Sequence, residues 1–206
     1  MFHSALAALR PARLFARAVF LAGTVLLTGC ATAYLDGAVK DIPDSQIAKP
    51  ARPQPVQVVV EFQTNGVANT RATEHVKPMV ISRITSSGMF SDVQEKPTAG
   101  GLLSVKINNV ALMDDAAKKG FMTGLTFGIA GNVVTDGYVC TVSYLPPGQS
   151  TPIVKSSKHA IHTAIGNASA PASGVKAESL DDAVRAMVRQ IVGVALNDLS
   201  REAAFK

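Results

Sequence analysis

The sequence contains no tryptophan, and aromatic residues of all kinds make up only 5% of its 206 positions. Cysteine occurs twice, at Cys30 and Cys140, which leaves no room for a network of disulfides once one thiol is used for anything else. Hydrophobic residues nevertheless reach 47%, enough for a packed core, so the core has to consist mainly of aliphatic side chains.

Clustered positive charge is also missing, although the formal net charge is +5. Arg10, Arg13 and Arg17 precede Cys30 and no acidic residue does, so the remainder of the chain carries only +2. Its longest basic run is Lys118-Lys119. A nucleic-acid groove needs a basic stripe with aromatic platforms, so we expect no nucleic-acid partner.

The first thirty residues have the order of an export signal. A basic segment up to Arg17 is followed by ten apolar residues, Ala18 to Leu27, and then by small residues. Ten residues are too few to cross a bilayer, which takes about 20 residues of helix. This pattern predicts a signal peptide over residues 1–29.

Leu27-Thr28-Gly29-Cys30 resembles the lipobox of bacterial lipoproteins. The resemblance implies that the Cys30 thiol carries a diacylglycerol, that cleavage falls between Gly29 and Cys30, and that the new amino group is acylated. Ala31 follows where an aspartate would favour retention at the inner membrane. The resemblance therefore implies an outer-membrane lipoprotein with its domain in the periplasm.

The segment after the lipobox is polar and rich in proline. Four prolines occur between Asp36 and Pro55, and no apolar period accompanies them. Because proline favours extended backbone, we expect residues 30–55 to form a tether that carries the lipidated cysteine.

Residues 56–206 have the periodicities of one α+β domain. Alternating apolar residues predict strands over 56–64, 102–113, 138–145 and 153–165, with a short strand near 89–93, and a slip of phase at Asn108-Asn109 suggests a bulge. Apolar stripes predict helices over 76–87 and 179–203, the second capped by Ser179, and a loop over 166–176. The order favours an α+β fold with an antiparallel-rich sheet of about four to five strands and two helices packed on one face.

The same residues carry a second resemblance. A strand containing Val58, Val60 and Phe62 is followed by a helix that ends in Ser87-Gly88-Met89-Phe90. A Gly-rich apolar segment then precedes a strand that contains tyrosine, and an amphipathic helix closes the chain. From Val56 onward this order is similar to the small periplasmic α/β domains of envelope lipoproteins, including the curli-channel lipoprotein and the auxiliary lipoproteins of lipid transporters.

Residues with catalytic or metal-binding chemistry do not form a recognisable motif. His159 and His162 lie three apart on a predicted strand, so they should face opposite sides and cannot share a metal. Asp181-Asp182 occupy a predicted first helical turn, where carboxylates stabilise the helix dipole. Cys140 lies on an apolar strand face and is expected to be buried and unreactive. We therefore predict no enzyme activity, cofactor or metal site.

One apolar segment stands apart from these elements. Phe121 to Val134 contains fourteen residues without charge. Three interpretations remain open for segment 120–134: a buried crossover, an oligomer contact and a loop that dips into a membrane. Its candidate contact residues are Gly120, Phe121, Gly124, Phe127, Gly128 and Gly131.

Together these patterns lead to two expectations about function. The first is a non-enzymatic, outer-membrane-anchored periplasmic lipoprotein that binds or scaffolds an envelope protein, whose identity the sequence does not give. The alternative is a homo-oligomeric component of an envelope transport or secretion system, which uses segment 120–134 for assembly or membrane contact.

Overall fold

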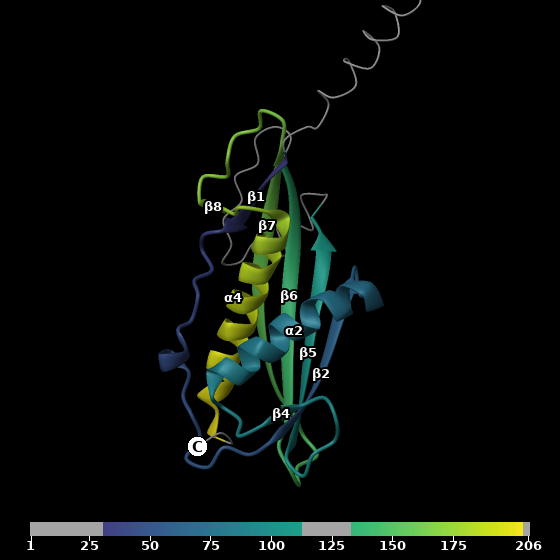
Figure 1. Cartoon of the computed structure of the whole chain (residues 1–206), viewed down its shortest axis with the longest axis vertical. Helices are drawn as coiled ribbons and strands as arrows, with labels where there is room; N and C mark the ends of the chain where they lie inside the picture. The colour runs from purple at the N-terminus through teal and green to yellow at the C-terminus, as the bar shows by residue number, and fades with distance from the viewer. Residues whose placement is uncertain (1–30, 113–132, 204–206) are drawn as a thin grey trace, which may run out of the picture. The chain divides into compact units, whose positions relative to one another are not determined.

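The computed structural model describes residues 31–112 and 133–203, which form an α+β domain (Figure 1). Its mixed sheet has eight strands within these residues, in the order β3-β2-β5-β6-β7-β1-β8, with β4 paired to β2. The strands are β1 (Ala31–Asp36), β2 (Val56–Thr64), β3 (Val67–Ala68), β4 (Val93–Gln94), β5 (Gly101–Ala111), β6 (Val133–Leu145), β7 (Ile153–Ile165) and β8 (Gly174–Lys176). The helices are α2 (Thr70–Ser87) and α4 (Leu180–Ser200), and a 3-10 turn, η1, spans Asp44–Gln46.

The predicted α+β class and its two helices are confirmed, whereas the predicted number of strands is too low. Strands β3, β4 and β8 have two or three residues each, too few for an alternating pattern to be recognised. Most pairings are antiparallel, including the β6–β7 hairpin, but β2 pairs in parallel with β5 and β4. The crossover from β2 to β5 runs through α2, as parallel strands require.

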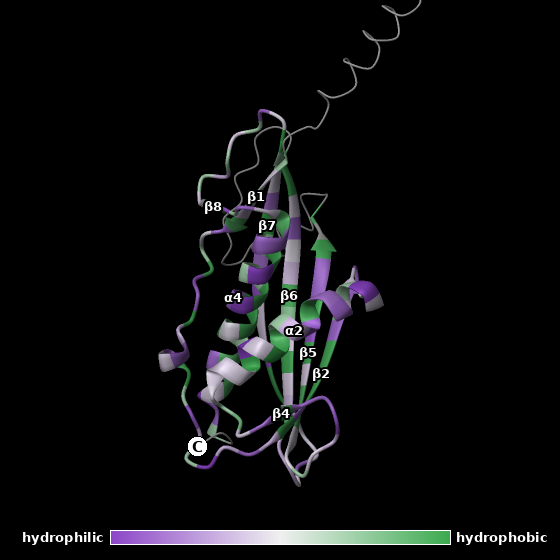
Figure 2. Cartoon of the chain, in the orientation of Figure 1, coloured by the Kyte–Doolittle hydropathy of each residue, from purple (hydrophilic) through white to green (hydrophobic). Residues whose placement is uncertain are grey.

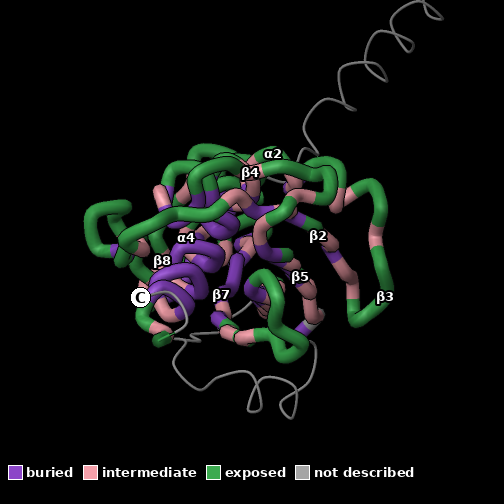
Figure 3. Tube along the Cα trace, turned by 90° about the horizontal axis from the view of Figure 1, so that it is seen from below, coloured by how far each residue is buried: buried purple, intermediate pink, exposed green. Residues whose placement is uncertain are grey.

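Both helices pack on the same face of the sheet (Figure 1). Between them and the strands lies one aliphatic core, in which Val80, Ile84, Leu103, Met187 and Ile191 have no exposed area. Figure 2 shows hydrophobic segments on the strands behind the helices, and Figure 3 shows that α4 is mostly buried. Neither helix of the described residues has the length and apolar composition needed to cross a bilayer.

Helix α2 begins six residues earlier than the apolar stripe predicts. Asn69 caps it by accepting a hydrogen bond of 3.0 Å from the Ala72 amide, while Thr73 Oγ1 accepts one of 2.9 Å from the Phe62 amide. The first turns are mostly exposed and therefore have no apolar period to reveal them. Pro78 lies inside the helix, and Gly88 ends it with φ of +66°, as predicted.

The bulge expected at Asn108-Asn109 is wrong, because β5 keeps continuous register with both β2 and β6 through these residues. The apolar phase changes there for another reason. Val110 points to the face opposite the helices, where it packs with Leu112, Val139 and Ala160 in a second, smaller cluster. A change in the buried face therefore produces the same sequence pattern as a bulge.

Residues 31–55, here called the N-terminal strap, differ from the extended tether that we expected. Residues 31–36 form β1, which pairs with β7 and β8 inside the sheet. Further along, Ile47 is buried against the core and η1 contacts α2. The predicted loop over 166–176 likewise contains β8, whose partner is β1. Strands β1 and β8 form through partners more than 100 residues away, which local composition does not show.

Candidate functional site at the start of the N-terminal strand

The sequence-predicted modification and contact residues fall outside the described part of the chain. They are Gly29 and Cys30 at the predicted cleavage site and Gly120, Phe121, Gly124, Phe127, Gly128 and Gly131 in the apolar segment. Val133 and Val134, the last residues of that segment, begin β6. The structure describes Ala31, the residue that follows Cys30, and the candidate site consists of the residues around it.

Ala31 is held in the sheet from the first residue of β1. It is the register partner of Ile165, and the ladder continues to Leu35, which is paired with Ile161. Ala33 and Leu35 face the core and are each 7% exposed. Strand β1 thus lies between β7 and β8, so no flexible residues separate position 30 from the sheet.

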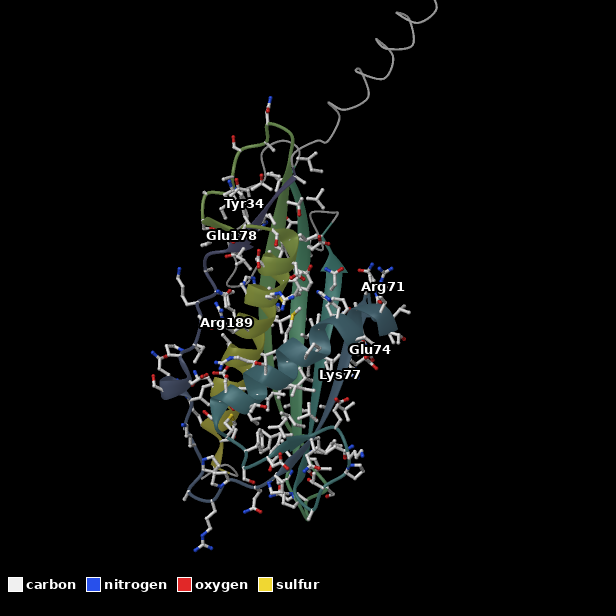
Figure 4. The ribbon with its side chains drawn as sticks, in the orientation of Figure 1. Tyr34, Arg71, Glu74, Lys77, Glu178 and Arg189 are labelled. Carbon is white, nitrogen blue, oxygen red and sulfur yellow. The ribbon has the colours of Figure 1, made fainter. Side chains whose placement is uncertain are left out.

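A shallow groove of about 260 Å³ runs beside the start of β1. Its lining residues are Ala31, Thr32, Ala33, Thr163 and the run Lys176–Leu180. Leu180 is 59% exposed there, and Figure 4 shows Tyr34 and Glu178 on this side of the domain. The groove is lined by apolar side chains, by the hydroxyl groups of Thr32, Thr163 and Ser179, and by one basic and one acidic side chain.

A buried polar cluster lies further along β1, on the face opposite the helices. Asp36 and His162 are each 1% exposed. His162 Nδ1 is 2.9 Å from Thr135 Oγ1, and its Nε2 is 3.8 Å from Asp36 Oδ2. Asp36 Oδ1 also accepts a hydrogen bond of 2.8 Å from the Ala38 amide. The cluster connects β1, β7 and β6.

His159 points to the other face of β7, so the prediction that the two histidines face opposite sides is confirmed. Its Nε2 lies 2.5 Å from Gln190 Oε1 on α4. Burial is the main influence on the imidazole and lowers its pKa, while the hydrogen bond to Gln190 opposes that shift. Residues 31–112 and 133–203 contain no group of three His, Cys, Asp or Glu side chains placed to hold a metal.

Cys140 has no exposed area, which confirms the predicted burial. Burial raises the pKa of its thiol to about 12, and the hydrogen bond with Ser157 opposes this only in part. The nucleophilic form of cysteine is the thiolate, so Cys140 is a poor nucleophile near neutral pH.

The paired aspartates have structural roles in the first turn of α4, as expected. Ser179 Oγ accepts a 3.0 Å hydrogen bond from the Asp182 amide and caps the helix. Asp181 is 2.6 Å from Arg185 Nε and 3.1 Å from His75 Nε2. The hydrogen bond from Arg185 is the main reason why the pKa of Asp181 is lowered.

Sequence reasoning missed the polar contacts that fasten the strap. The Arg83 side chain, 5% exposed, pairs with Asp44 and donates a 2.7 Å hydrogen bond to the Ile42 carbonyl. Arg189, labelled in Figure 4, lies 2.9 Å from Asp41. Arg83 lies in the apolar stripe of α2. Because a buried charge needs a partner, this position in the sequence could have indicated such a contact.

Comparison with known proteins gives only distant similarity. No family model and no curated protein matches the chain. Two crystal forms of PelC from Paraburkholderia phytofirmans, described as dodecamers, share 12% and 11% identity with it. Each covers 84% of this chain and 100% or 99% of PelC, with TM-scores of 0.39 and 0.37.

A Xanthomonas campestris protein assigned to the family DUF330 is similar at 12% identity, covering 75% of this chain and 87% of its own, with a TM-score of 0.35. At these scores the similarity carries no argument about activity or assembly, and the chain is assigned to no family.

Proposed function

We propose that this chain is a lipid-anchored envelope lipoprotein, attached through Cys30 to the outer membrane, whose periplasmic domain binds or scaffolds an envelope protein. The observation that carries the proposal is the position of β1 in the sheet. The lipobox resemblance implies cleavage between Gly29 and Cys30, and Ala31, the residue after that cysteine, is paired with Ile165 in the sheet. A signal sequence cut at this bond would release the domain with its first strand intact.

The buried polar residues support a binding role over a catalytic one. Arg83 pairs with Asp44, His159 contacts Gln190, and Cys140 lies opposite Ser157 on β7. Each of these groups has a structural neighbour that accounts for its burial.

Acylation is tested with two cysteine variants and a clickable fatty acid fed to cells. Cys30→Ser should abolish labelling of the protein and leave the signal peptide attached. Cys140→Ser is the matched control, because the second thiol is buried in the core and should not affect labelling. Processing at the same bond in Cys30→Ser, together with outer-membrane association, would refute the anchor.

A specific surface supports the alternative, a homo-oligomeric component of a transport or secretion system. Val59, Leu102 and Val154 are 45%, 36% and 53% exposed on the face opposite the helices. Leu102 is paired with Leu145, and Val59 and Val154 lie diagonally next to that pair. The four residues therefore form an apolar row across β2, β5, β6 and β7, of the kind that marks a contact between proteins.

Val154→Asp tests this row. If copies of the chain associate through it, sedimentation should show a smaller species for the variant than for the natural protein. Gln149→Asp, in the exposed turn after β6, is the control and should leave the mass unchanged. A natural protein that stays monomeric at all concentrations would rule out the oligomer.

A further inference from the structure

The absence of slack between Cys30 and the sheet restricts how an anchored domain can be oriented. Adjacent Cα atoms are 3.8 Å apart, and Ala31 is already fixed opposite Ile165. The inference that follows rests on the proposed acylation of Cys30. Acyl chains on that residue would bring the start of β1 to the membrane surface, because no tether can hold it away.

The described residues at this end of the sheet are suited to a lipid interface. The end contains the start of β1, the start of β6, and the turn that leaves β7. Ala31–Leu35, Val133–Thr135 and Ile165–Ser173 contain no charged side chain. Val134 and Ile165 are 52% and 43% exposed there. Contact with lipid through these residues would cover apolar surface. The nearby charged side chains Lys176 and Glu178 line the groove beside β1, and they would have to stay in water because burying a charge is costly.

The opposite end of the sheet has a different composition. Strand β2 starts there. The exposed residues Arg52, just before β2, and Asp92, Glu95 and Lys96, on either side of β4, are charged. The Val56 amide, 2.9 Å from the Asp92 carbonyl, fixes this region beside β2. Since β6 has 13 residues, the two ends are roughly 40 Å apart along the strands.

We propose that the uncharged end, formed by Ala31, Val134, Ile165 and the turn at 166–170, lies directly against the lipid surface that holds Cys30. The strands of the sheet then run away from the membrane. The charged end and the β6–β7 turn face the periplasmic space, where a partner can reach them. The acyl chains supply most of the binding energy.

The test measures the surroundings of two single-cysteine labels in the acylated, full mature protein. Asn167→Cys places an environment-sensitive fluorophore in the turn after β7, and Gln149→Cys places it in the turn after β6. Both positions are exposed, and the buried Cys140 should remain unlabelled. The protein is reconstituted in vesicles of phosphatidylethanolamine and phosphatidylglycerol, and quenching by acyl-brominated lipid is compared with quenching by aqueous iodide.

We expect the label at position 167 to show blue-shifted emission, quenching by brominated lipid and loss of quenching by iodide. The label at position 149 should show the reverse. A third variant adds a flexible Gly-Ser segment of about ten residues between Cys30 and Ala31 of Asn167→Cys, which gives a reach of roughly 17 Å. The segment should weaken the lipid quenching while the acyl chains stay attached.

Each contrary result has a defined meaning. If intact mass shows acylation but iodide quenches both labels equally, the orientation is wrong and the anchor stands. Protection of position 167 from both quenchers indicates that another protein or a second copy covers this end, which also overturns the proposal. A mass without acyl chains overturns the anchor itself and is read before any quenching is measured.

Discussion

The strap and the helix–sheet layer are held in place by different forces. The layer depends on aliphatic contacts, with Ile84, Leu103 and Ile191 fully buried between α2, α4 and the sheet. Beyond β1, the strap contributes few apolar residues, mainly Ile47, and otherwise relies on Arg83 and Arg189 reaching across from the two helices. The stability of the helix–sheet layer comes from many apolar contacts, whereas the position of the strap beyond β1 depends on the hydrogen bonds and ion pairs of one or two side chains.

This difference implies that residues 37–55 of the strap can open while the core stays folded. Regions with few apolar contacts open locally at a lower free-energy cost than the global unfolding free energy. Such an opening would leave Ala31 in the sheet, because β1 is paired on both sides with β7 and β8. The predictions below therefore separate the strap beyond β1 from the core.

The largest effect is expected from a cavity in the core. Leu103→Ala removes a fully buried side chain from the central strand β5 and should lower the free energy of unfolding by about 2–5 kcal/mol. Urea denaturation measures the change. Lys106→Ala is the control on the same strand, because its side chain is half exposed and its ion pair with Glu61, at 3.8 Å, is weak. Equal losses for the two variants would contradict the assignment of the core.

Arg83→Ala is the corresponding change for the strap. It removes the pairing with Asp44 and the hydrogen bond to Ile42, and the half-exposed Asp44 can regain water, so we expect a loss of about 2–3 kcal/mol. Hydrogen exchange should rise more in residues 37–47 than in β5.

Arg189→Ala is the matched control for this variant. Its ion pair with Asp41 is exposed on both sides and should contribute about 0–1 kcal/mol. Uniformly faster exchange across strap and core in Arg83→Ala would show that the two regions unfold as one unit.

The same contrast explains which parts of the fold the sequence reveals. Strand β2 and helix α4 could be predicted because half of their residues face one core and repeat with a fixed period. Strand β1 could not, since its six residues owe their structure to β7 and β8, which lie far along the chain. The prolines in the strap suggested an extended tether. A Pro-rich segment can also have one defined position when side chains elsewhere bind it, as Arg83 binds Ile42 and Asp44.

The candidate site was only partly accessible to the same reasoning. The opposite orientations of His159 and His162 followed from the strand period, and the burial of Cys140 from its apolar neighbours. The proximity of Ala31 to Val134 and Ile165 depends on strand pairing, which no local pattern in the sequence specifies.

A smaller effect is expected at the start of α2. Asn69→Ala removes the side-chain oxygen that accepts from the Ala72 amide at 3.0 Å, as well as the 3.2 Å hydrogen bond to Thr64 Oγ1. Loss of a helix N-cap typically costs about 1 kcal/mol. Asn69→Asp keeps the acceptor and should recover most of the stability. Thermal or urea unfolding that gives the same loss for both variants would show that the cap is unimportant.

At neutral pH the smallest effect is expected from titration of His159. Its pKa is lowered in the folded protein, chiefly by burial, relative to the ordinary value of 6.5. As the pH falls below about 6.5, the unfolded chain takes up this proton first, so stability should decrease with acidification and level off below the folded pKa. At pH 7 His159 is largely neutral in both the folded and the unfolded chain, and little change in stability is expected.

His159→Gln can still contact Gln190 but cannot titrate, so its unfolding free energy should fall less steeply between neutral and acidic pH. Every other residue is the same in the two proteins, so the difference between the two pH profiles isolates position 159. Parallel pH profiles for the two proteins would show that the β7–α4 contact does not depend on a neutral imidazole.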